Sequence, residues 1–135
     1  GAGLAGTELS IYLKDLGYEV GIVEMAGDIN DGGNSCHKLA VKDMLIQKKI
    51  PLHLNTRAEE ITDRGVLCAG PVGEVFYEAD TVVYAAGMKS RTKEALQFND
   101  VAPIFHMVGD CRFSSTILNA TGSAYTAARY LGRYN

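Results

Sequence analysis

The sequence has 135 residues, 13 of them basic and 16 acidic, so its formal net charge is −3, and 47% of its residues are hydrophobic. This balance is typical of a globular domain and excludes a disordered chain. Basic residues form no continuous stripe, which disfavours binding to nucleic acid. No apolar stretch approaches the roughly 20 residues of a membrane helix, and no secretory signal opens the sequence, so we expect a cytoplasmic protein that contacts no membrane.

The N-terminal part predicts a turn, a helix, a strand and a loop, in that order. The glycine-rich residues 1–6 precede a helix over residues 7–16, on which Leu9, Leu13 and Leu16 share one apolar face. A strand is expected over residues 18–24, and a stretch rich in Gly, Asn and Asp follows it.

The middle of the chain predicts a second helix and a set of short strands. The helix begins at Ser35, ends before Pro51, and has a broad apolar face that includes Leu39, Leu45 and Ile46. After a short strand over residues 52–55, three strands at 59–62, 65–68 and 74–78 are separated by turn residues, which indicates an antiparallel meander.

Two apolar runs in the remaining sequence predict further strands. Residues 81–86 are continuously apolar, as in a buried parallel strand, and Gly87 closes them. A polar link precedes a second apolar run over residues 104–108, and alanines at helical spacing predict a helix over residues 117–131.

The opening glycines carry the strongest functional signal. Gly1, Gly3 and Gly6 match the pattern GxGxxG at the start of a helix, and Glu24 ends the next predicted strand. In a dinucleotide site, the first glycine allows a tight turn, the second lets a pyrophosphate approach the backbone, and the third lets the helix pack closely on the sheet. The alternative is an ordinary turn with a solvated acid at the strand end.

The acid at Glu24 also predicts which nucleotide binds. A carboxylate there accepts hydrogen bonds from the adenosine ribose hydroxyls, whereas it repels a 2′-phosphate. No Lys or Arg lies between Glu24 and Lys38. We therefore expect NADH rather than NADPH.

Catalytic and metal-binding side chains are not indicated. The chain has no pair of closely spaced cysteines, and its histidines stand on three separate predicted elements, at His37, His53 and His106. Metal ligands and general bases need clustered partners, so we expect no metal site and no catalytic residue in this chain.

Four segments in this order resemble a known family. They are GAGLAGTELSIYL at residues 1–13, IVEM at 22–25, DTVVYAAGMKS at 80–90, and VGDC at 108–111 followed by a helix. Together they resemble the FAD/NAD(P)-binding pyridine nucleotide oxidoreductases. More narrowly, they resemble the C-terminal nucleotide-binding part of NADH:flavin oxidoreductases such as 2-enoate reductase and 2,4-dienoyl-CoA reductase.

The resemblance implies an α/β fold with a Rossmann-like parallel sheet, flanking helices and an antiparallel β-meander crossover, whose first strand is missing from the chain. It implies an NAD(P)-binding domain over residues 1–88 and the returning C-terminal segment of an FAD-binding domain over residues 89–135. Since there is no second GxGxxG and no room for a flavin-bearing barrel, the chain is expected to be part of a larger flavoenzyme. Residues 104–108, or a strand from a second chain, would fill the place of the missing strand. The expected partners are the remainder of a flavoenzyme or a second copy.

The resemblance also assigns residues to the two cofactors. Gly1, Gly3, Gly6 and Glu24 would contact NADH, with Glu8 on the nicotinamide side. The remaining cofactor-binding residues are Ala86 and Gly87, which would line the nucleotide, and Gly109 and Asp110, which would contact FAD. From its position alone, Asp110 could instead cap the helix that follows it.

These expectations favour an NADH-binding fragment of a flavin-dependent oxidoreductase, which passes hydride from NADH to FAD for reduction of an activated alkene of the enoate or dienoyl-CoA type. The alternative is a non-catalytic nucleotide-binding or interaction domain, inactive alone because the flavin-binding part is absent. An independent NAD-dependent dehydrogenase is disfavoured, because no catalytic Tyr-x-x-x-Lys pattern or His–carboxylate arrangement is evident.

Overall fold

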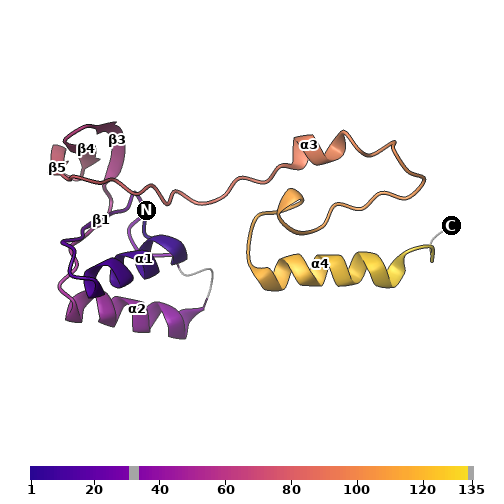
Figure 1. Ribbon diagram of the computed structural model, residues 1–135, viewed down its shortest axis with the longest axis horizontal. Helices are drawn as coiled ribbons and strands as arrows, with labels where there is room; N and C mark the ends of the chain where they lie inside the picture. Colours follow the sequence, from indigo (N-terminus) through magenta and orange to yellow (C-terminus); the bar gives the residue numbers. More distant parts are fainter. Residues whose placement is uncertain (31–33, 134–135) are drawn as a thin grey trace. The chain divides into compact units, whose positions relative to one another are not determined.

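The computed structural model describes residues 1–30 and 34–133 (Figure 1). The chain forms two compact units, Gly1–Gly87 and Met88–Asn135. Their identities as parts of an NAD(P)-binding and an FAD-binding domain stay a prediction.

The first unit is built on a β-α-β arrangement. The first four elements of the unit in chain order are α1 (Leu4–Asp15), β1 (Ile22–Val23), α2 (Ser35–Gln47) and β2 (Leu52–His53). Strands β1 and β2 pair in parallel, with Ile22 opposite Leu52, and α2 makes the crossover that a parallel pair requires. Helices α1 and α2 lie side by side (Figure 1). This is the expected Rossmann-type α/β fold.

Helix α1 buries a different face from the one its leucines predict. The buried residues are Gly6, Thr7, Ser10 and Ile11, whereas Leu9 and Leu16 are exposed. The two hydroxyls are satisfied within the helix, since Ser10 Oγ donates to Gly6 O at 2.7 Å and Thr7 Oγ1 donates to Gly3 O at 3.0 Å. Small side chains allow close packing, so the helix approaches its neighbours along this face and the predicted leucine face is wrong.

A small apolar core joins the two helices to the parallel strands. On α2 only Val41 and Leu45 are buried, while Leu39 and Ile46 are exposed, so the apolar face is narrower than predicted. The whole core cluster consists of Ala2, Ile11, Ile22, Ile29, Val41, Leu45 and Ile50.

The predicted antiparallel meander is confirmed. It consists of β3 (Arg57–Thr62), β4 (Gly65–Gly70) and β5 (Gly73–Glu78), in the order β3-β4-β5. Gly65 has φ +146°, and a Cβ there would lie 2.0 Å from the carbonyl oxygen of Tyr77, so only glycine fits this turn. Cys68 of β4 is fully buried, and burial raises the pKa of its thiol, as does the charge of Glu59.

The two predicted strands over residues 81–86 and 104–108 are absent from the described structure. A β-strand is held by its ladder, and neither run finds a partner strand among the described residues. Val83 and Tyr84 are exposed rather than buried. Apolar composition alone therefore misled the prediction, and residues 104–108 do not act as a substitute strand.

The second unit is mainly helical, with α3 (Thr92–Leu96), a 3₁₀ turn η1 (Gly109–Cys111) and α4 (Ile117–Tyr130). Helix α4 agrees with the predicted range to within one residue at its C-terminal end. Side chains hold η1 in place, since Ser123 Oγ on α4 accepts from Gly109 N at 2.9 Å and Thr92 Oγ1 donates to Cys111 O at 3.0 Å.

Adjacent residues of α2 provide a test of the core. Leu45 is 3% exposed and Ile46 is 76% exposed. We expect Leu45→Ala to lower the free energy of unfolding by about 2–4 kcal/mol, because it removes buried apolar volume. The matched change Ile46→Ala is expected to alter it by less than about 0.5 kcal/mol. Urea unfolding followed by circular dichroism measures both, and equal effects would contradict the assigned core.

Candidate functional site

The glycine-rich turn closes tightly on itself and on a later segment. A Cβ on Gly6 would lie 2.1 Å from the carbonyl oxygen of Gly1, and a Cβ on Gly1 would lie 2.5 Å from that of Ala85. Real carbon and oxygen atoms do not approach so closely, so packing requires glycine at both positions. The turn is thereby held against the segment that leads to Ala86.

Gly3 differs, because none of the residues that the structure describes requires a glycine there. Its backbone has φ −73° and ψ 178°, a conformation open to any residue. The nearest atom to an added Cβ would be the carbonyl oxygen of Asn30, at 4.0 Å. Gly3 is the N-cap of α1, and no side chain caps the helix there. The position is therefore an open space in front of helix N–H groups, which suits an anion that approaches the backbone, such as a pyrophosphate.

The acid at the end of β1 is bound to this turn. Glu24 Oε2 accepts from Ala2 N at 2.6 Å, and Oε1 accepts from Ala26 N at 2.7 Å. Burial raises the pKa of Glu24, whereas the hydrogen bonds from Ala2 and Ala26 and the positive charge of the N-terminus lower it, and the resulting pKa lies below its usual value. Each carboxylate oxygen has a further lone pair, so the ionised group can still accept from ribose hydroxyls.

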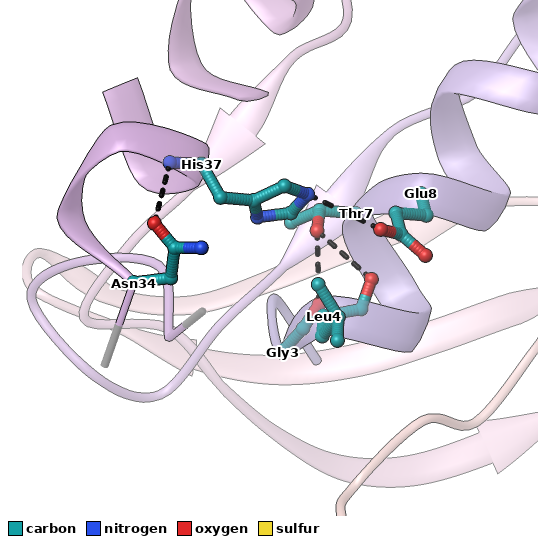
Figure 2. Close-up of polar contacts among 6 residues, drawn as sticks. All are labelled: Gly3, Leu4, Thr7, Glu8, Asn34 and His37. Carbon is teal, nitrogen blue, oxygen red and sulfur yellow. Dashed lines mark hydrogen bonds and ion pairs between the residues drawn. The ribbon is translucent and has the colours of Figure 1, made fainter. Parts of the chain in front are cut away.

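A second polar contact joins the two helices beside the turn. His37 Nε2 on α2 lies 3.2 Å from Glu8 Oε1 on α1, as Figure 2 shows. The backbone N–H of His37 donates to Asn34 Oδ1 at 3.1 Å, which caps α2. His37 Nδ1 is buried and has no hydrogen-bond partner among the described residues.

The pair between Glu8 and His37 has no signature in the sequence, because the two residues stand on different helices and no motif spacing links them. Only the packing of α1 against α2 brings them together (Figure 2).

The other expected cofactor residues fall in two places. Ala86 is beside the turn, since its Cα would lie 3.7 Å from a Cβ on Gly1, and Gly87 follows it with φ +88°. Gly109 and Asp110 belong to η1 in the second unit. Thr116, rather than Asp110, caps α4, so the alternative capping role of Asp110 is wrong. The cofactor contacts of all these residues remain predictions.

The part of the chain that the structure describes contains no group of three or more His, Cys, Asp or Glu residues that could hold a metal ion. Within the same residues, no helix combines the length and apolar character needed to cross a membrane.

Comparison with known proteins identifies the family. Residues 1–104 match the family described as pyridine nucleotide-disulphide oxidoreductase, and the chain belongs to this family. Members of the family use FAD and NAD(P)H, the cofactor types that the sequence predicted.

Individual relatives are much longer reductases. The chain is 34% identical over 134 residues to cinnamate reductase from Clostridium sporogenes, covering 96% of this chain and 20% of that protein. It is 26% identical over 132 residues to bilirubin reductase from Mediterraneibacter gnavus, covering 97% of this chain and 21% of that protein. The chain thus spans about a fifth of the length of these curated relatives.

A solved structure shows the same fold. A complex of 2-naphthoyl-CoA reductase with 2-naphthoyl-CoA matches with a TM-score of 0.80 and 26% identity, over 93% of this chain and 19% of that one. The expected resemblance to the enoate and dienoyl-CoA reductases is consistent with these findings.

The hydrogen bonds of Glu24 predict an acid-sensitive contribution to stability. Its folded pKa is lowered, so this contribution is fully present above the ordinary value of 4.5 and is lost as pH falls through the folded value. We expect Glu24→Gln to cost about 1 kcal/mol at pH 7, because the amide has one acceptor oxygen for two N–H donors. The difference should shrink below pH 4.5.

The control for this experiment is Glu19→Gln. Glu19 forms an ion pair with Lys14 at the surface, and its side chain is 94% exposed. Urea unfolding at several pH values compares the two variants with the original protein. A Glu24→Gln effect that is absent at pH 7, or that grows as pH falls, would show that the carboxylate does not hold the turn.

Proposed function

We propose that this chain is the NADH-binding part of a flavin-dependent oxidoreductase that passes hydride from NADH to FAD for the reduction of an activated alkene. The observation that carries the proposal is the glycine at position 3, which neither its backbone conformation nor packing among the described residues requires. A bound pyrophosphate accounts for it, because the phosphates must approach the backbone at the helix N-terminus.

Glu24 would bind the adenosine end of the nucleotide. Its ionised carboxylate is oriented by Ala2 and Ala26 and can accept from the 2′- and 3′-hydroxyls of the ribose. The same carboxylate would repel a 2′-phosphate, which supports NADH over NADPH. Turn and acid thus bind two different parts of one ligand.

Glu8 would lie on the nicotinamide side of the nucleotide, and Ala86 and Gly87 would line it. When bound, the reduced nicotinamide supplies a hydride for which the flavin is the acceptor. Hydride transfer between two cofactors needs no acid or base from the protein, so the task of this chain is to hold the nucleotide in the reactive position. This agrees with the expectation that no residue here is catalytic.

The second unit is proposed as the returning segment of the FAD-binding domain, with Gly109 and Asp110 near the flavin. The remainder of the enzyme, or a second copy, would supply the main flavin-binding part and a partner strand for residues 81–86. The length of the relatives supports the first of these sources. Turnover would then require the larger enzyme, and the chain alone would be inactive.

The choice of an activated alkene follows from the relatives. Cinnamate is a carboxylate conjugated with an alkene, and 2-naphthoyl-CoA is a thioester conjugated with an aromatic ring system, so the names of both reductases point to conjugated carbonyl compounds. An electron-poor double bond of this kind accepts hydride readily. The site for that substrate would lie outside this chain.

Gly3→Ala tests the proposal. Among the described residues, the added methyl group would come no nearer than 4.0 Å to another atom, the carbonyl oxygen of Asn30, so we expect stability to fall by no more than about 1 kcal/mol, the cost of alanine in place of glycine at an N-cap. The same methyl group would obstruct the pyrophosphate, and we expect the Kd for NADH to rise about tenfold or more, equivalent to about 1.4 kcal/mol. Isothermal titration calorimetry measures the Kd.

Gly122→Ala is the matched control, because Gly122 lies on α4 with nothing within 4 Å of an added Cβ. It should leave NADH affinity unchanged. The proposal fails if the original protein binds no NADH at millimolar concentration, or if Gly3→Ala binds it as well as the original protein does.

A further inference from the structure

A carboxylate on the loop after β1 holds two lysines of α2. Asp28 Oδ1 lies 2.7 Å from Lys42 Nζ, and Asp28 Oδ2 lies 2.9 Å from Lys38 Nζ. Asp28 Oδ1 also accepts from Ile29 N at 2.8 Å. The hydrogen bonds from Lys42 and Lys38 hold the pKa of Asp28 far below its usual range, so the carboxylate is ionised at any physiological pH.

The loop that carries Asp28 is fixed at both ends to the candidate nucleotide site. Ala26 N donates to Glu24 Oε1, and Asn30 N donates to Ala2 O at 2.9 Å. Asp28 is two residues from each of these anchors, so its Cα lies within about 8 Å of both Ala26 and Asn30. Ile29, the next residue, is buried in the core and keeps the loop in place. Asp28 therefore stands at the rim of the region assigned to the adenosine ribose.

The charges of four side chains, Glu24, Asp28, Lys38 and Lys42, cancel. Glu24 and Asp28 contribute two negative charges, and Lys38 and Lys42 contribute two positive charges. A 2′-phosphate would add about two more negative charges and needs cations that are not already neutralised. The two nearest lysines in the sequence after Glu24 are the two that Asp28 binds, and both are partly exposed.

From this arrangement we propose that Asp28 is a specificity-determining residue: by binding Lys38 and Lys42, it denies a 2′-phosphate its cations and makes the site select NADH over NADPH. The inference rests on the proposed function of the glycine-rich turn. Asp28 lies outside the GxGxxG pattern, four positions after Glu24, and it acts through the two lysine side chains that it neutralises.

Removal of the Asp28 charge should raise the affinity of the site for a 2′-phosphate. Without Asp28 the two lysines would be left with an uncompensated charge on flexible four-carbon stems. They would then be available to a phosphate at the ribose. The attraction would be partly exposed to solvent, so it should weaken as salt is added.

The test is Asp28→Asn in the complete flavoenzyme, with NADH and NADPH as probes. The asparagine Oδ1 can still accept from Ile29 N, so the loop keeps its backbone hydrogen bond while the charge is lost. We expect the Kd for NADPH to fall about fivefold, an effect that half-exposed ion pairs can supply, and the Kd for NADH to change less than about twofold. The gain should diminish between 50 and 500 mM salt, as charge screening requires, roughly in step with the Debye length.

Two variants serve as controls. Asp43→Asn makes the same change on α2, where Asp43 Oδ2 accepts a hydrogen bond from Gln47 Nε2 of the same helix, and should leave both Kd values unchanged. The triple change Asp28→Asn, Lys38→Gln, Lys42→Gln should abolish the gain in NADPH affinity, because the cations are then absent.

A second measurement covers the case in which Asp28→Asn fails to fold. Lys38→Gln with Lys42→Gln leaves Asp28 unneutralised, so NADPH affinity should fall further while NADH affinity is kept. If the original enzyme binds NADH but neither variant shifts the ratio of the two Kd values, the role of Asp28 is overturned and the proposed function stands. If the original enzyme binds neither nucleotide, both are overturned.

Discussion

The bond between the Glu24 carboxylate and the backbone N–H of Ala2 is the constraint on which the first unit depends. It joins the end of β1 to the turn that opens α1, across 22 residues of sequence. The same carboxylate accepts from Ala26, and the loop beyond it returns to Ala2 through Asn30. One ionised group therefore fixes the strand end, the glycine-rich turn and the following loop together, and places an acid beside an open helix N-terminus.

Local sequence signals were sufficient where short-range physics decides the structure. Asn34 caps α2 at the predicted start of the helix, and Gly65 opens β4 after the turn from β3, where a Cβ would meet the carbonyl oxygen of Tyr77 on β5. Predictions were wrong where the structure of a segment depends on the element that packs against it. The apolar run over residues 81–86 has no strand beside it among the described residues. On α1 the buried face contains Thr7 and Ser10 instead of leucines, and the hydroxyls of both donate hydrogen bonds to backbone carbonyls at the start of the helix.

The site was predictable to the extent that it depends on glycine and on one acid. The pattern GxGxxG located the turn, and the spacing to Glu24 located the acid, but neither shows that Gly1 and Gly6 are required by packing while Gly3 is not. Contacts made across elements were beyond sequence analysis. Glu8 contacts His37 only because α1 packs on α2. Asp28 forms ion pairs with two lysines only because its loop lies beside α2, which carries both of them.

The most direct test of the account is a titration of the ¹⁵N-labelled protein with NADH, followed by backbone amide chemical shifts. If the open N-terminus of α1 receives the pyrophosphate and Glu24 receives the ribose, the largest changes will occur at the amides of residues 3–6 and 24–28. Saturating NADH that leaves these amides unshifted, or that perturbs only residues far from the turn, would contradict the account.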